Sequence, residues 1–339
     1  MRTSRIVLFA AAVVVVGAAA VLFARTAPFV KPLDKVSLRL NWTVYGEHAP
    51  FFVAKEKGFF RDQGLDVEIL PGSGSGATVK LIGEGASDFG YADSGTLVKG
   101  IASGAKIKSV AVFTQRNTQS LMFFASNPIR EPKDIVGKKL AFTSGDASAQ
   151  VFSSVLLTMG IDASQVHLLY YSTPREKEQA VFDGKADAFG GLYIDQLPRI
   201  REQWKPREVG VFKLHEHGLV ALAMGILVHD DLIKRRPDLV KRFVKASQQG
   251  AQWAQAHPQE AAAIVFKHTQ GDTLPSVATQ VEYWLGCIHS SRTAGQPTGW
   301  MAADDWASTI ALVAKTTKID APKELSLYYT NEFVDETIR

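Results

Sequence analysis

Three side chains suited to binding a small molecule, Trp42, Tyr45 and His48, stand close together in the sequence. Hydrophobic and polar residues alternate over residues 36–40, which predicts a half-buried strand just before them. Pro50 is typical of the first turn of a helix, so a helix should follow. An indole, a phenol and an imidazole would then lie at the carboxyl end of a strand, where open α/β sheets bind ligands.

Two loops rich in Gly and Ser, residues 71–76 and 143–148, also precede expected helices. Free backbone N–H groups at a helix start can bind an anion or a carbonyl oxygen. The same composition also fits a plain connecting turn, or capping of the second helix by Ser144 or Asp146, and these alternatives stay open. One loop lies in each expected domain, so the two loops could face each other across a cleft. The candidate contacts in them are Ser73, Gly74, Thr143, Ser144, Gly145 and Ser148.

Two segments that begin at Gly85 and Gly184 both place an Asp three positions after the Gly and a Phe soon after it. This repetition predicts two domains that are built alike. Asn41, next to Trp42, is a further candidate ligand contact.

The chain has 339 residues, of which 46% are hydrophobic and 21% are charged, as in a globular protein long enough for two domains. Residues 1–26 are an expected targeting segment, with Arg2 and Arg5 before an apolar run over residues 6–24. This run is either a cleaved signal peptide or a retained membrane anchor, and either would export the rest of the chain. Without the three arginines of this segment the formal net charge falls from +4 to +1, which gives no support to nucleic-acid binding.

The sequence shows no arrangement of residues typical of a hydrolytic enzyme. It contains no Gly-x-Ser-x-Gly elbow, no His-Glu-x-x-His and no phosphate-binding Gly-x-x-x-x-Gly-Lys-Ser/Thr loop. Cys287 is the single cysteine, which excludes an intrachain disulfide and a cysteine cluster for a metal, and we expect it to be buried. His215 and His217 have no third ligand at a fixed spacing, so we expect neither a metal nor a cofactor.

The segment around the first candidates resembles a known family. Leu-Asn-Trp (40–42), a His, Phe-Val-Ala-Lys-Glu-Lys-Gly-Phe-Phe (52–60) and Gly-Leu-Asp-Val-Glu-Ile (64–69) are similar to motifs of the SsuA/THI5-like (NMT1/THI5-like) family. Its members include solute-binding proteins of ABC importers for sulfonates, taurine, nitrate and thiamine-pyrimidine precursors. The resemblance runs from about residue 35 to about residue 320. It also implies ligand contacts at Ser94, Tyr193 and Asp195, which match positions that members of the family use to contact their ligands.

The resemblance implies an α/β protein with the type II periplasmic-binding-protein fold, two similar lobes joined by a two-segment hinge. Lobe 1 would contain residues 35–126 and 216–339, and lobe 2 would contain residues 127–215. Such a protein would be a periplasmic monomer, or one anchored to the inner membrane by residues 6–24. It would close on a small-molecule ligand and deliver it to an ABC permease in the cytoplasmic membrane.

The ligand remains the most open part of the prediction. Trp42 and His48 resemble residues of the pyrimidine branch of the family, and Asp195 could accept a hydrogen bond from an exocyclic amine. A sulfonate or nitrate would need a cation, often Arg, and no Arg lies in the candidate loops. We therefore expect a heteroaromatic solute similar to a thiamine-pyrimidine precursor, with an aliphatic sulfonate, taurine or nitrate as the alternative.

A second alternative is an enzyme. Fungal members of the family make the thiamine pyrimidine and use the family His as a reactant with pyridoxal phosphate and iron. His48 matches that His, but those enzymes carry a Cys-rich iron motif and this chain has one Cys. We therefore expect a binding protein that is not an enzyme.

Overall fold

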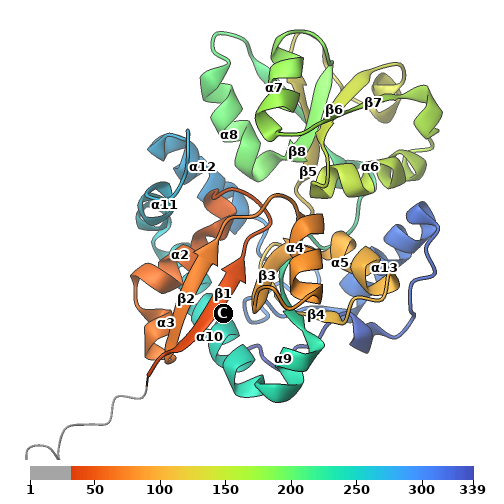
Figure 1. Cartoon of the computed structure of the whole chain (residues 1–339). Coiled ribbons are helices and arrows are strands. Elements are labelled where there is room, and N and C mark those ends of the chain that lie inside the picture. Colours follow the sequence, from red (N-terminus) through yellow and green to blue (C-terminus); the bar gives the residue numbers. More distant parts are fainter. Residues whose placement is uncertain (1–31) are drawn as a thin grey trace, which may run out of the picture. The chain divides into compact units, whose positions relative to one another are not determined.

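The computed structural model describes residues 32–339, so the expected targeting segment, residues 1–26, lies outside the described residues. Residues 34–339 form one compact unit that contains two five-stranded sheets with helices packed around them (Figure 1). Over the described range, no helix combines the length and the apolar character that crossing a membrane requires.

The first sheet has the strand order β2-β1-β3-β10-β4. β1 pairs in parallel with β2 and β3, whereas β10 runs antiparallel to β3 and β4. Val36 and Leu38 of β1 are buried, as their alternation with polar residues predicted. The strands are β1 (Asp34–Arg39), β2 (Leu65–Leu70), β3 (Phe89–Asp93), β4 (Ile107–Val112) and β10 (Met224–His229).

The second sheet has the strand order β7-β6-β8-β5-β9, which repeats the pattern of the first. β6 pairs in parallel with β7 and β8, and β5 runs antiparallel to β8 and β9. The prediction of two lobes that are built alike is therefore confirmed. The strands are β5 (Gln119–Phe124), β6 (Lys139–Thr143), β7 (His167–Tyr171), β8 (Ala188–Leu192) and β9 (Val209–Lys213).

Strand β5 corrects the predicted lobe boundary at residues 126–127. All of β5 pairs within the second sheet, so the chain passes to lobe 2 before residue 119. The polar composition and prolines after residue 125 had suggested the later boundary, but they mark a surface turn between β5 and β6. The antiparallel strands β5 and β10 are thus the first strands that the chain forms after it passes from one lobe to the other.

Helices cover both sheets (Figure 1). Those of lobe 1 are α2 (Ala49–Glu56), α3 (Phe59–Asp62), α4 (Ser75–Gly83), α5 (Ser94–Ala102), α9 (Asp230–Arg235), α10 (Pro237–Ala256), α11 (Pro258–Phe266), α12 (Leu274–Leu285) and α13 (Ala303–Thr317), with 3-10 helices η1 (Gly46–His48) and η5 (Leu325–Leu327). Those of lobe 2 are α6 (Ala147–Thr158), α7 (Pro174–Phe182) and α8 (Tyr193–Gln203), with η2 (Pro132–Ile135), η3 (Ala163–Gln165) and η4 (Leu214–His217).

Two crossings, residues 113–118 and 214–223, form the hinge between the lobes. The crossings lie side by side, because the backbone N–H of Ala223 donates to the carbonyl of Thr114. The hydroxyl groups of Thr114 and Tyr91 are 2.9 Å apart, which ties the first crossing to β3. Cys287 is buried next to this region, as predicted, and its backbone carbonyl accepts from Gln115 and Arg116.

The close approach of α10 to α2 fixes the segment that follows β1. Gly250 of α10 lies against the carbonyl of Pro50, where no side chain would fit. Pro50 lies in the first turn of α2, and Gly58 follows that helix with a positive φ of 83°, as their residue types predicted. The residues between β1 and α2 are therefore held on a rigid support.

Candidate functional site

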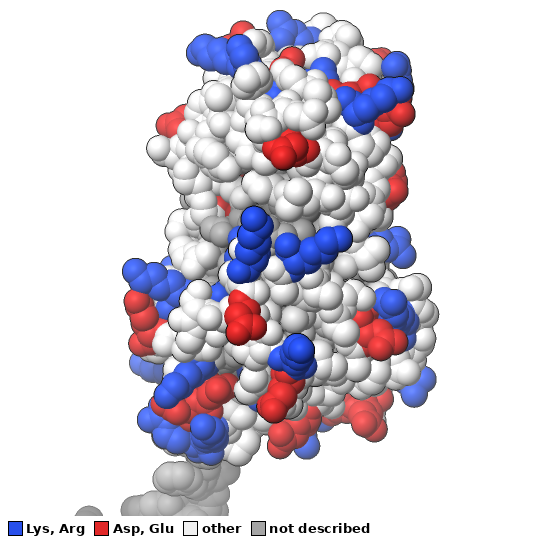
Figure 2. All heavy atoms as spheres, turned by 90° about the vertical axis from the view of Figure 1, so that its right-hand side faces the viewer, with Lys and Arg blue, Asp and Glu red and all other residues white. Residues whose placement is uncertain are grey.

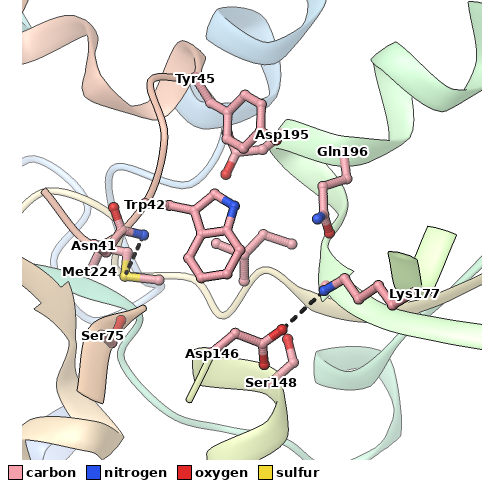
Figure 3. Close-up of a pocket in the computed structure, with 12 residues that line it drawn as sticks. Asn41, Trp42, Tyr45, Ser75, Asp146, Ser148, Lys177, Asp195, Gln196 and Met224 are labelled. Atoms are coloured by element: carbon pink, nitrogen blue, oxygen red, sulfur yellow. Dashed lines mark hydrogen bonds and ion pairs between the residues drawn. The ribbon is translucent and has the colours of Figure 1, made fainter. Parts of the chain in front are cut away.

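A cavity lies where the strand ends of the two lobes face each other (Figure 3). The carboxyl ends of parallel strands β1, β6 and β8 lead into it, which is the predicted position. Lobe 1 contributes Asn41, Trp42, Tyr45, Ser75 and Met224 to its lining. Lobe 2 contributes Asp146, Ser148, Lys177, Gly191, Leu192, Asp195 and Gln196.

The apolar surface of the cavity is largely aromatic. The indole of Trp42 extends into the middle of the cavity, and the ring of Tyr45 lies above it (Figure 3). Met224 and Leu192 add apolar surface. Burial raises the pKa of the Tyr45 phenol to about 12, so this hydroxyl stays neutral at physiological pH. The cavity therefore offers flat apolar faces to a ring-shaped ligand.

A buried hydrogen-bond network holds the loop that carries Trp42. The backbone N–H of Tyr45 donates to Nδ1 of His48, and Nε2 of His48 lies 2.7 Å from Oδ1 of Asn41. Asn41 in turn donates from Nδ2 to Oε1 of Glu47. Since Nδ1 accepts, the imidazole carries its proton on Nε2 and donates to Asn41. Burial lowers the pKa of His48 to about 3, so His48 is a neutral support beneath the cavity.

Lys177 provides a buried positive charge on the lobe 2 side. Its side chain is 1% exposed, and Nζ lies 2.9 Å from Oδ2 of Asp146 and 2.6 Å from the carbonyl of Gly190. Asp146 caps α6 by accepting from the backbone N–H of Ala149. Sequence reasoning predicted a capping residue here, but not that the cap would also neutralise a lysine that lines the cavity.

Asp195 and Gln196 enter the cavity from the first turn of α8 (Figure 3). Burial, together with the nearby carboxylates of Glu47 and Asp272, raises the pKa of Asp195 well above its usual value. Oδ1 of Asp195 and Oε1 of Gln196 are buried and have no hydrogen-bond partner among the described residues. Two acceptor atoms at the cavity are thus free to receive hydrogen bonds from a ligand.

The two Gly/Ser loops do face each other across the lobes. A Cβ atom added to Gly74 would lie 2.6 Å from the carbonyl oxygen of Gly145. Gly74 has a φ of 127°, and its N–H donates to the carbonyl of Asn41, so the first loop also packs on the segment that follows β1. The lobes therefore meet at backbone that only glycine can supply.

Five of the predicted contacts line the cavity: Asn41, Trp42, Tyr45, Ser148 and Asp195. His48 lies below it, and Gly74 and Gly145 lie at the contact between the lobes. Ser73 and Ser144 are exposed outside the lining. The hydroxyl of the first loop that reaches the cavity belongs to Ser75, two positions after Ser73 and at the start of α4.

Three further candidates are occupied elsewhere or lie outside the lining. The hydroxyl of Ser94 donates to the carbonyl of Ala223 at 2.8 Å, so it stabilises the hinge side of the fold. Thr143 is buried at the end of β6, and its hydroxyl has no partner among the described residues. The hydroxyl of Tyr193 lies 3.4 Å from the sulfur of Cys287, which directs this ring away from the cavity.

Sequence reasoning missed several lining residues, namely Ser75, Asp146, Lys177, Gly191, Leu192, Gln196 and Met224. Lys177 lies inside an amphipathic helix, and its charge gave no reason to expect burial. Met224 comes from the strand that returns across the second crossing. Within residues 32–339, no cluster of His, Cys, Asp and Glu side chains suited to a metal is present.

The sequence of this chain is similar to those of known proteins. A sequence profile described as NMT1/THI5 like matches residues 46–261. A formylaminopyrimidine-binding protein from Halalkalibacterium halodurans is 22% identical over 282 residues, which cover 82% of this chain and 84% of that protein. The 4-amino-5-hydroxymethyl-2-methylpyrimidine phosphate synthase THI13 from Saccharomyces cerevisiae is 25% identical over 238 residues, which cover 67% of this chain and 69% of that protein.

The fold is also known from solved structures. The periplasmic aliphatic sulphonate binding protein SsuA from Escherichia coli superposes with a TM-score of 0.66 at 15% identity, covering 86% of this chain and 94% of that chain. This likeness confirms the predicted periplasmic-binding-protein fold with two α/β lobes. Because the family profile matches more than half of its residues, this chain belongs to the NMT1/THI5-like family.

Proposed function

We propose that this protein is the substrate-binding component of an ABC importer and that it captures a small heteroaromatic solute similar to a thiamine-pyrimidine precursor. The observation that carries this proposal is the cavity between the lobes, where the indole of Trp42 lies among buried groups that can donate and accept hydrogen bonds.

The polar groups of the cavity match a ring that carries an amino group. The unpartnered Oδ1 of Asp195 can accept a hydrogen bond from an exocyclic amine. An ammonium has three N–H groups, and Asp146 and Gly190 accept two from Lys177, so the third can donate to a ring nitrogen or a carbonyl oxygen. The similarity to a protein named for binding formylaminopyrimidine agrees with this choice.

The alternative ligand, an aliphatic sulfonate or another small anion, is less favourable on electrostatic grounds. The described lining includes Lys177 as a cation, but its charge is already balanced by Asp146 at 2.9 Å. Asp195 would add a second acidic group beside the anion. A buried charge needs a partner of opposite sign, and this cavity would leave a sulfonate without one.

The second alternative, an enzyme that makes the thiamine pyrimidine, has support from the name of the yeast relative. Such chemistry would need His48 as a reactant. The imidazole is fully buried, and both of its ring nitrogens are engaged, by the N–H of Tyr45 and by the amide of Asn41. We therefore propose a binding role. Bound pyridoxal phosphate would colour the purified protein, and visible absorbance would contradict this choice.

Closure of the lobes would enclose the ligand. The cavity takes residues from both lobes, so a bound ligand contacts the closed state more extensively than an open one. We propose that the protein is exported to the periplasm, that it acts as a monomer without nucleic acid, and that the closed form docks on a permease. Whether residues 6–24 are cleaved or retained as an anchor does not alter this scheme.

A thermal-shift screen tests the proposed ligand class. Aminopyrimidines should raise the melting temperature of the purified protein, whereas taurine, alkanesulfonates and nitrate should not. Trp42→Ala should remove the shift, because it deletes the ring face in the cavity. Trp253→Ala is a matched control, since Trp253 stacks on His257 at 4.4 Å and does not line the cavity. A shift with sulfonates alone would refute the proposed ligand.

A further inference from the structure

Helix α8 contributes side chains to two separate hollows of the molecule. Asp195 and Gln196, in its first turn, reach the cavity between the lobes (Figure 3). Tyr193, Leu197 and Arg201 line a second hollow, between α8 and α12. These three residues are spaced four positions apart, so they lie along one face of the helix. We call this second hollow the hinge groove.

The hinge groove takes residues from both lobes and from the hinge. Lys213 comes from β9 of lobe 2, and Arg116 comes from the first crossing. Tyr283 of α12 and Cys287, just after that helix, come from lobe 1. Helix α8 packs against α12 (Figure 1). A molecule bound in the groove would therefore contact groups whose separation changes when the lobes rotate about the hinge.

The groove has an aromatic and apolar floor. The centroids of the Tyr193 and Tyr283 rings are 6.0 Å apart, and the side chains of Leu197 and Cys287 are buried beside them. The hydroxyl of Tyr193 lies 3.4 Å from Sγ of Cys287, which holds its ring against lobe 1. A flat ring can pack on such a floor.

Two arginines of the groove have free guanidinium groups. Within the described chain, neither Arg116 nor Arg201 donates a side-chain hydrogen bond or forms an ion pair. By contrast, Arg242 and Arg292 are paired with aspartates at 2.7 Å and 2.6 Å. On the face shown in Figure 2, Asp and Glu side chains also lie next to most Lys and Arg side chains of lobe 1. The two guanidinium groups of the groove are thus available to an anion.

The other charged groups of the groove leave one positive charge in excess. Nζ of Lys213 lies 5.1 Å from the centroid of the Tyr193 ring and 3.5 Å from Glu216, which balances its charge. The described lining also includes Glu282, which accepts a hydrogen bond from Gln259 of α11 at 3.4 Å. Glu282 offsets one of the two arginines, so a ligand with one negative charge would complete the balance.

We propose that the hinge groove is a second ligand site and that it binds a small aromatic carboxylate. A carboxylate can accept two parallel hydrogen bonds from one guanidinium, and the attached ring packs on the two tyrosines. Such a ligand contacts both lobes and stabilises the arrangement that also forms the cavity. Occupation of the groove should therefore strengthen binding in the cavity. This last step alone rests on the proposed function.

Calorimetric titration of the full chain with benzoate tests the site. Benzoate supplies one carboxylate on a flat ring, and benzamide has nearly the same shape without the charge. The wild type should bind benzoate about tenfold more tightly than benzamide, because only benzoate forms charge-assisted hydrogen bonds with the arginines. Equal affinity for the two compounds would overturn the proposal.

Arg116→Gln and Arg201→Gln show whether benzoate binds in the groove. Each removes one guanidinium and should raise the Kd for benzoate about tenfold. Arg61→Gln is the matched control, because Arg61 is also exposed but lies on α3 and does not line the groove. All three variants should melt at the wild-type temperature, since these exposed side chains carry little of the stability. An unchanged Kd in both R116Q and R201Q would refute the site.

Titration of 4-amino-2-methylpyrimidine with and without benzoate tests the link between the groove and the cavity. Benzoate should lower the Kd of the pyrimidine about fivefold in the wild type and in R61Q, and less in R201Q at the same benzoate concentration. A Kd that benzoate does not change would refute the link. If the pyrimidine fails to bind the wild type, the proposed ligand class is wrong, and the benzoate titrations still decide whether the groove is a site.

Discussion

Replacing Lys177 by Met tests how far the site depends on one buried cation. The side chain of Lys177 is 1% exposed and that of its partner Asp146 is 10% exposed. Methionine has a similar volume but leaves the carboxylate of Asp146 without its cation. Removing one partner of a buried ion pair costs about 3–5 kcal/mol. Asp146 would keep the bonds from the backbone N–H groups of Thr143 and Ala149, which should hold the loss near the lower end of that range.

A double-mutant cycle measures this pair directly. Urea unfolding of K177M should show a free energy of unfolding about 3 kcal/mol below that of the wild type. Adding Asp146→Asn should recover part of the loss, because a neutral amide needs no cation and still caps α6. A loss below about 1 kcal/mol in K177M, or a cycle without coupling, would refute the reasoning.

A surface lysine provides the control for charge removal. The side chain of Lys185 is 70% exposed, and its ammonium lies 3.0 Å from Asp183 at the surface. Exposed ion pairs contribute less than about 1 kcal/mol, so Lys185→Met should leave stability nearly unchanged. K177M should also weaken binding of an aminopyrimidine, which K185M should not, since Lys177 lines the cavity and Lys185 does not.

Three further changes test other parts of the structure. Gly74→Ala should weaken ligand binding about tenfold, because the added Cβ would lie 2.6 Å from the carbonyl oxygen of Gly145 and would hold the lobes apart. Gly85→Ala is the control for backbone strain, because Gly85 also has a positive φ, 70°, but has open space around it. Gln280→Leu should lower the unfolding free energy by about 1–3 kcal/mol by leaving buried polar groups unpaired, as urea unfolding would measure. Two arginines lower the pKa of Asp238 to about 2, so its contribution to stability should be lost as the pH falls towards 2, and Asp238→Asn should flatten that part of the pH profile.

Candidate residues that line the cavity lie soon after the ends of strands. Asn41 and Trp42 come just after β1, and Asp195 comes just after β8. Strand alternation and turn residues locate strand ends within one or two positions, and parallel strands bring their carboxyl ends to one edge. Those two rules suffice to predict which loops meet, including the facing pair of Gly74 and Gly145.

The same rules could not predict which residues of a helix face the cavity. Tyr193 begins α8, and its ring turns towards Cys287, whereas Asp195 and Gln196 reach the cavity. A helix rotates by 100° per residue, so an error of one position in its start changes which side chain points inward. Ser75 in place of Ser73 is an error of the same kind. Lys177 is a different case, because only the fold shows that a charged helix residue is buried beside Asp146.

Gln280 forms hydrogen bonds to backbone groups of both lobes. Its Oε1 accepts from the backbone N–H of Gly46, which begins the short helix that carries Glu47, and its Nε2 donates to the carbonyl of Asp195. The side chain of Gln280 thus connects the backbone of η1 in lobe 1 to the backbone of α8 in lobe 2. The bond from Gln280 to Asp195 joins the two lobes, so opening of the lobes would have to break it and expose both polar groups to water.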